Sequence, residues 1–177
     1  MIEFRVDSRD IVDWMKVYAA APQRIDQIIV RVLNHVGGTA RTKVKSALAK
    51  QTGVKVRTVD VGLRTFNAFP SRQSYEIVAS GRPISLAEFD PRQTLRGVSA
   101  RPWGKRRVFP STFIVRTLGG HVFRREGSAR LPIVKLWGPS LPKELLRDAV
   151  PKAFVEEVQL KLPIRVEHEL RRELMRK

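Results

Sequence analysis

The sequence predicts an α+β fold, in which a long N-terminal helix and C-terminal helices pack on a mainly antiparallel sheet with an extended basic loop or arm. Helical apolar spacing dominates residues 8–69, alternating strands and turn residues fill 74–140, and helical spacing returns over 142–177. The 177 residues are predicted to form one domain, 1–177, with enough chain to bury a core.

The N-terminal elements follow from spacing and capping. Ile2–Val6 alternates apolar and polar residues, which predicts a short strand. Asp7 or Ser8 can cap a short helix that follows. The apolar residues of that helix are Ile11, Trp14, Met15 and Tyr18.

A long helix is predicted next, with Pro22 in its first turn and Gly53 closing it. Its apolar residues recur every three or four positions from Ile25 to Leu48. The pair Gly37–Gly38 interrupts this stripe, weakens the helix by about 1 kcal/mol per glycine and marks a place where it can bend.

The next segment, Val54–Phe69, carries two patterns. Its valines favour a strand, whereas the spacing of Val59, Leu63 and Phe66 allows a helix. Helix is the favoured interpretation, because Thr52 or Gly53 can cap it and Pro70 can end it.

From Ser74 onward the sequence predicts short strands separated by glycine and proline turns. The prolines and cations of 81–111 resist regular sheet pairing and are typical of an extended arm. The predicted strands are Tyr75–Ala79, Val98–Trp103, Arg107–Phe109, Thr112–Arg116, His121–Arg125 and Ile133–Trp137.

The C-terminal part returns to helix. Lys143–Ala149 predicts one or two turns, Pro151 suits a new helix start, and Pro163 predicts a kink or restart. The acids Glu156, Glu157, Glu167 and Glu169 lie among cations, so they are interpreted as solvated faces with i,i+4 ion pairs such as Glu157–Lys161.

Charge is the strongest functional signal. The chain carries +17, and Arg92–Lys135 holds eleven lysines and arginines against one acid, Glu126. Because these cations alternate with strand formers, they are expected on a fixed scaffold that faces an acidic partner: nucleic acid, an anionic membrane surface or an acidic protein. No apolar run approaches the ~20 residues that span a bilayer, so a membrane partner is not predicted.

Lys105, Arg106 and Arg107 are three consecutive cations beside Trp103, and they repel one another unless an anion relieves them. A solubilising hairpin tip is the alternative. The predicted contacts to nucleic acid or an acidic partner are Arg96, Arg101, Lys105, Arg106, Arg107, Arg116, Arg124, Arg125 and Arg130.

Trp103 and Trp137 can anchor a subunit interface, although a core tryptophan is the ordinary alternative. The apolar, proline-rich segment 131–142 has the composition of a contact strand. The predicted interface residues are Trp103, Phe109, Leu131, Ile133, Leu136 and Trp137.

Catalytic chemistry is not predicted. The histidines His35, His121 and His168 fall in different elements, and no phosphate-loop, zinc or nucleophile-elbow spacing occurs. The absence of cysteine excludes disulfides and thiolate metal sites. We therefore expect no catalytic residues, no cofactor and no metal.

Three consecutive segments together are similar to one known family. They read GRPISLAEFDPRQTLRGVSARPWGKRRVFPSTFIV, then GGHVFRREG, then RLPIVKLWGPSLP. Their order and spacing resemble the minor tail protein Z family of tailed bacteriophages and prophages, which are tail completion proteins. The resemblance covers about the middle third of the chain, and the long helix followed by KSALAKQTGVK also looks like the family.

The resemblance implies a structural virion protein in the neck region, at the head-proximal end of the tail, assembled in the bacterial host cytoplasm. It would finish the tail for joining to the filled head, as a hexameric ring around the DNA path, beside tail-terminator and head-completion or connector proteins. It supplies no catalytic residues. The rival interpretation is a cellular basic nucleic-acid-binding protein; a nuclease is weaker, because the basic block holds only Glu126 as an acid.

Overall fold

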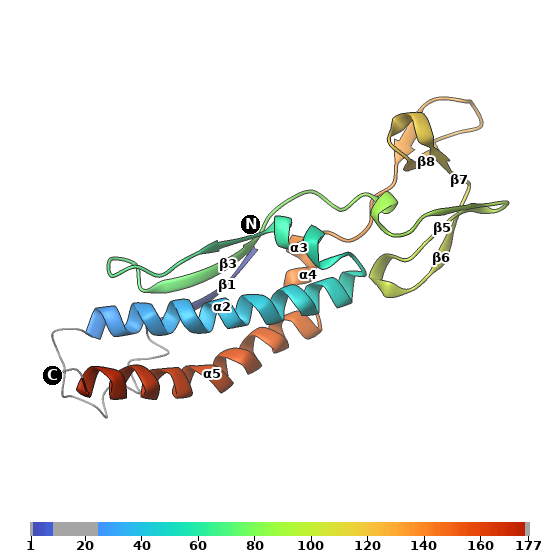
Figure 1. Cartoon of the computed structure of the whole chain (residues 1–177). Helices are drawn as coiled ribbons and strands as arrows, with labels where there is room; N and C mark the ends of the chain where they lie inside the picture. The colour runs from blue at the N-terminus through green and yellow to red at the C-terminus, as the bar shows by residue number, and fades with distance from the viewer. Residues whose placement is uncertain (1, 9–24, 176–177) are drawn as a thin grey trace.

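A computed structural model describes residues 2–8 and 25–175 (Figure 1). Helix α2 (Ile25–Thr52) and helix α5 (Ala149–Leu174) run side by side, and the sheet β1–β3–β2 lies along α2. The short helices α3 (Val56–Gly62) and α4 (Leu141–Leu145) pack against the same helix. These elements form a body from which residues 81–140 project. The predicted α+β class with long N- and C-terminal helices is confirmed.

The body sheet has β3 (Ser74–Ala79) at its centre, with β1 (Ile2–Asp7) and β2 (Leu63–Phe66) antiparallel on either side. Central position explains why five of the six β3 residues are buried. The ring of Phe4 in β1 stacks on Phe154 of α5 with centroids 4.7 Å apart, so the second long helix also reaches the sheet.

Helix α2 is continuous through Gly37–Gly38, where a bend was possible, and it ends as predicted at Gly53. Its apolar stripe is buried from Ile28 to Leu48 except at Ala47, which is partly buried. The predicted helix with Ile11 and Trp14, and the start at Pro22, lie outside the described residues.

The helical interpretation of Val54–Phe69 is half wrong. Helix α3 ends at Gly62, and Leu63–Phe66 forms strand β2 instead. Pairing with β3 buries Leu63, and this tertiary contact outweighs the local helical spacing. Pro70 then lies in the hairpin turn, which the Phe69–Arg72 bridge closes.

Of the two outcomes predicted for Pro163, a kink or a restart, the restart does not occur in helix α5. It runs through Pro163 as one curved helix, neither restarting nor ending there (Figure 1). Packing along α2 stabilises it despite the missing N–H of the proline. Pro151 lies within the first turn of this helix, and α4 supplies the separate short helix before it.

Glu157 and Glu169 are not solvated, contrary to the interpretation from sequence: they are 8% and 0% exposed. Glu169 accepts hydrogen bonds from Arg31 Nε of α2 at 2.7 Å and from Arg165 at 2.5 Å. It is therefore a buried tie between the two long helices. The i,i+4 spacing indicates Arg165 as a partner but gives no sign of Arg31, which lies 138 residues away.

Gly37 is needed for close packing, whereas its neighbour is not. A Cβ at Gly37 would lie 2.2 Å from the buried ring of Tyr75, while a Cβ at Gly38 meets nothing within 4 Å.

We therefore expect Gly37→Ala to lower the free energy of unfolding by about 1–3 kcal/mol through overpacking. Gly38→Ala is the matched control and should raise it by up to about 1 kcal/mol, because alanine is the better helix former. Chemical denaturation of both variants measures this, and equal effects of the two would contradict the packing role of Gly37.

Candidate basic interface

The basic block forms an arm whose two ends are held together. Near Ile84 and Pro139 these ends hydrogen bond as an antiparallel pair: Ile84 N–H donates to the Pro139 carbonyl at 2.9 Å, and Gly138 N–H donates to the Ile84 carbonyl at 2.7 Å. We call this pairing the arm base. Everything between residues 85 and 137 is thereby presented as one projection from the body (Figure 1).

The arm contains two three-stranded antiparallel sheets. The first has the order β4–β5–β6 (Arg92–Thr94, Gly97–Ala100, Arg107–Pro110), and the second β7–β8–β9 (Thr112–Val115, His121–Arg125, Ile133–Lys135). A hydrogen bond of 2.9 Å from Val98 N–H to Thr112 Oγ1 joins them. The predicted strands are found in both, shortened where η3 (Pro102–Gly104) follows β5 and where β9 ends at Lys135.

All nine predicted contact residues have exposed side chains, but they do not form one cluster. Five lie on or beside the first sheet: Arg96, Arg101, Lys105, Arg106 and Arg107. Four lie on or beside the second: Arg116, Arg124, Arg125 and Arg130. The cations are thus spread over both sheets of the arm, and consecutive strand residues such as Arg124 and Arg125 project from opposite faces. A spread of this kind suits an extended anionic partner more than a small one.

Mutual repulsion among the three consecutive cations is relieved within the chain at Arg106, contrary to expectation. Its guanidinium forms an ion pair with Asp90 and lies 3.3 Å from Ser99 Oγ. Asp90 stands just before the block in sequence, so a charge count from Arg92 onward misses it. Arg106 is therefore already neutralised, and Lys105 and Arg107 remain as the outward cations of this turn.

Several cations lie over aromatic rings. Arg107 lies 5.7 Å from the ring centre of Trp103, Arg125 5.5 Å from that of Phe113, and Lys135 Nζ 4.6 Å from that of Trp137. Such contacts hold a charged group in place while leaving its solvent side free.

The predicted interface residues divide into two groups. Trp103, Leu131 and Trp137 are 40%, 66% and 48% exposed, so neither tryptophan is a core residue. Ile133 is half-buried, and Phe109 and Leu136 pack against the core from within the arm. Three of the six are thereby available to a neighbouring subunit.

A buried carboxylate fastens the arm to the body. Glu144 of α4 is 4% exposed and accepts a hydrogen bond from Trp103 Nε1 at 3.1 Å and another from Gln51 Nε2 of α2 at 2.9 Å. Glu144 was not predicted from the sequence. In the sequence, an acid just after Pro142 has the pattern of an ordinary exposed acid in the first turn of a helix. Its burial depends on Trp103, which the fold brings beside it.

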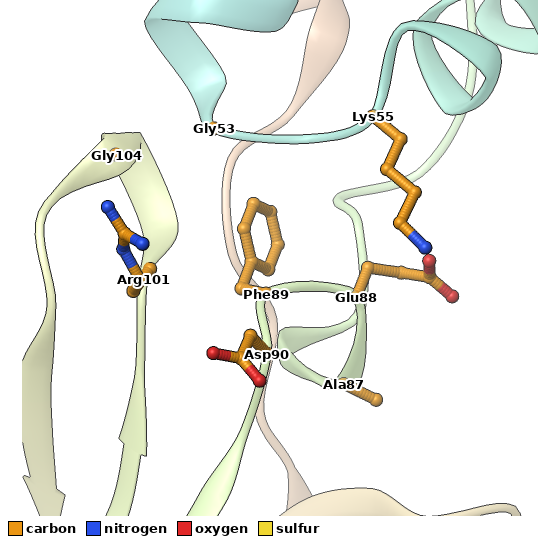
Figure 2. Close-up of a pocket in the computed structure, with 8 residues that line it drawn as sticks. All are labelled: Gly53, Lys55, Ala87, Glu88, Phe89, Asp90, Arg101 and Gly104. Carbon is orange, nitrogen blue, oxygen red and sulfur yellow. The ribbon is translucent and has the colours of Figure 1, made fainter.

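A cleft of about 650 Å³ opens where the arm meets the end of α2 (Figure 2). Phe89 forms its centre, and the side chains of Lys55 and Glu88 point toward one another at one side. Arg101 and Asp90 line the other part. With charges of both signs, this cleft suits a mixed-charge peptide more than a phosphate group. Lys55 was not predicted, because it lies far from the basic block in sequence.

Two of the three histidines come together in the structure. His35 of α2 and His168 of α5 are exposed and line one surface pocket with Lys161 and Arg165. His121 lies apart from them in β8, with Nδ1 3.1 Å from Ser85 Oγ. Among the residues that the structure describes, no three histidine or acidic side chains gather as a metal site. Nor is any helix within the described ranges long and apolar enough to cross a membrane.

No family model matches this chain, and no curated protein or solved structure is significantly similar to it.

The hydrogen bond from Arg106 holds the pKa of Asp90 below its ordinary value, and nearby Arg92 acts in the same direction. Because the folded-state pKa is the lower one, this pair contributes stability above the ordinary carboxyl pKa, and that stability disappears as pH falls through the lowered pKa.

We expect Arg106→Ala to raise the pKa of Asp90 toward its ordinary value, and Lys105→Ala to leave it unchanged. Carboxyl-carbon NMR titration of the two variants measures both. An unshifted pKa in the Arg106 variant would show that Asp90 takes its charge relief from elsewhere.

Proposed function

We propose that this chain is a structural subunit of a tailed bacteriophage particle, a tail completion protein at the head-proximal end of the tail. It assembles in the bacterial cytoplasm into a hexameric ring between the tail-terminator and head-completion or connector proteins. The ring serves head–tail joining and the passage or seating of DNA. No catalytic step is assigned to it.

The observation that carries the proposal is the arm. The segment that resembles tail completion proteins, residues 81–142, coincides with the arm base and the two sheets that project from the body. A projection on this scale carries surface for partners. Residues that resemble a family of assembly proteins therefore lie on a projection that offers surface to neighbours.

The composition of the arm supports an assembly role. Each sheet leaves two edge strands, β4 and β6 in one and β7 and β9 in the other. Exposed apolar residues, among them Val108, Leu118 and Leu131, stand among the cations. Open edges and apolar side chains favour protein contacts, and the cations and Pro110 on β6 discourage unlimited edge pairing.

The cations favour an anionic surface nearby, either DNA in the ring lumen or an acidic neighbouring ring. The same exposed cations also support the rival proposal of a cellular nucleic-acid-binding protein. The two proposals differ in where the protein is found.

We expect purified particles to contain a hexameric complement of this chain per tail, because a subunit placed on a symmetric tube takes its symmetry. Quantitative mass spectrometry of particles and a cryo-electron-microscopy map of the region between head and tail measure it. A single copy or a dimer per particle would refute the ring. Absence from particles, together with association with cellular nucleic acid, would establish the rival.

A second test concerns the outward cations of the η3–β6 turn. Lys105→Ala with Arg107→Ala should leave the fold intact, because neither residue makes an ion pair among the described residues and exposed charges add little stability. If the turn binds phosphate, the log–log salt dependence of duplex binding should flatten by up to roughly 0.9 for each phosphate that is no longer neutralised.

The control is Lys43→Ala with Arg57→Ala, which removes the same charge from exposed positions of α2 and α3. It should change the slope less. Equal slopes for the two double variants would mean that the turn has no special part in DNA binding. If both double variants keep the salt dependence of the unchanged protein, and the Lys105/Arg107 variant docks a neighbouring ring more weakly, the turn binds an acidic protein and not DNA.

A further inference from the structure

The hairpin between β4 and β5 carries an apolar side chain at its tip. The two turn residues are Leu95 and Arg96, and the positive φ of the turn falls on Gly97 after them. Leu95 is fully exposed, with a relative exposure of 108%. Figure 1 shows this hairpin beside the β5 label, reaching away from the helices. Leu95 packs against nothing in its own subunit, so its whole side chain is free to contact another molecule.

The tip is also rigid. Thr94 Oγ1 donates to the Gly97 carbonyl at 2.7 Å, and Ser111 N–H donates to the Arg96 carbonyl at 3.3 Å. Gly97 is required, because a Cβ there would lie 2.0 Å from the Phe109 carbonyl oxygen. These contacts restrain the backbone that carries Leu95 and Arg96, so the backbone loses less conformational entropy when the tip binds.

A groove on the body has room for such a side chain. It encloses about 550 Å³ between the C-terminal part of α2 and the start of α5. Three alanines line it, Ala47 from α2 and Ala149 and Ala153 from α5. Small side chains on both helices leave room for an apolar side chain to enter between them.

The groove also has a suitable charge. Copies of a chain that carries +17 repel one another, so they meet most easily where charge is balanced. Asp148 and Glu156 offset Lys50 and Lys152 around this groove. Neither acid takes part in an ion pair with any of the described residues, so both are available to an incoming arginine.

We propose that the tip residues Leu95 and Arg96 of one copy dock into this groove of a second copy, with Leu95 between the alanines and Arg96 beside Asp148 or Glu156. The inference rests on the proposed self-assembly and specifies its contact. Tip and groove are different surfaces of the chain, so the contact is head-to-tail and closes into a ring when the rotation between copies allows.

The chain has no cysteine, so single cysteines test the contact directly. Leu95→Cys protein and Ala153→Cys protein, one of them carrying a size tag, are mixed and mildly oxidised. The control mixes Val61→Cys protein with Ala153→Cys protein. Val61 is also an exposed apolar residue, with a relative exposure of 82%. We expect a mixed disulfide dimer several-fold more abundant in the first mixture, because disulfide formation requires the two Cα atoms to come close.

Equal yields of the mixed dimer in the two mixtures would overturn the proposal. It would also be overturned if adding Arg96→Glu to the Leu95→Cys protein left the yield of the mixed dimer unchanged. Adding Asp148→Arg or Glu156→Arg to the partner, at whichever acid contacts Arg96, should restore the yield that Arg96→Glu reduces, which a nonspecific encounter would not do. Circular dichroism of each variant verifies folding.

The two proposals fail separately. A ring in particles without the 95–153 cross-link would refute this contact and keep the proposed function. The cross-link in solution with the protein absent from particles would keep the contact and refute the tail assignment.

Discussion

Helix α2 is buried along two sides, because α5 packs on one and the strands β1 and β3 on another, and this burial organises the molecule. The helices α3 and α4 and the turn η3 of the arm also contact it. Close approach to the sheet depends on Gly37, whose missing side chain admits the ring of Tyr75. A helix that serves so many neighbours must be continuous, and its packing compensates for the weak propensity of the glycine pair.

Acids and cations are distributed unequally between the interior and the surface. Glu144, Glu157 and Glu169 are buried, whereas the cations of the arm face solvent. Glu169 shares its buried charge between Arg31 and Arg165, so neither arginine alone neutralises it. The chain carries twice as many cations as acids, which makes attraction of anions the main long-range property of its surface.

The sequence predicted the α+β class, the long helices and most strands of the arm, because each has a local period. It failed where contacts distant in the chain decide. Strand β2 exists because β3 pairs with it, α5 passes Pro163 because α2 supports it, and Glu169 is buried because Arg31 reaches it. At the candidate interface, the exposure of the cations was predictable, whereas Asp90 beside Arg106 and Glu144 beside Trp103 were not.

The attachment of Trp103 to Glu144 has a mechanical consequence. The arm is fixed at two separate points, at the arm base and at this carboxylate, so its orientation relative to the body is restrained. Swinging it about its base would break a hydrogen bond to a charged group, worth about 1.5–3 kcal/mol. Gln51 of α2 donates to the same carboxylate, so the direction of the arm is linked to the end of α2. In the proposed ring, this link within each subunit would set the angle between neighbouring copies.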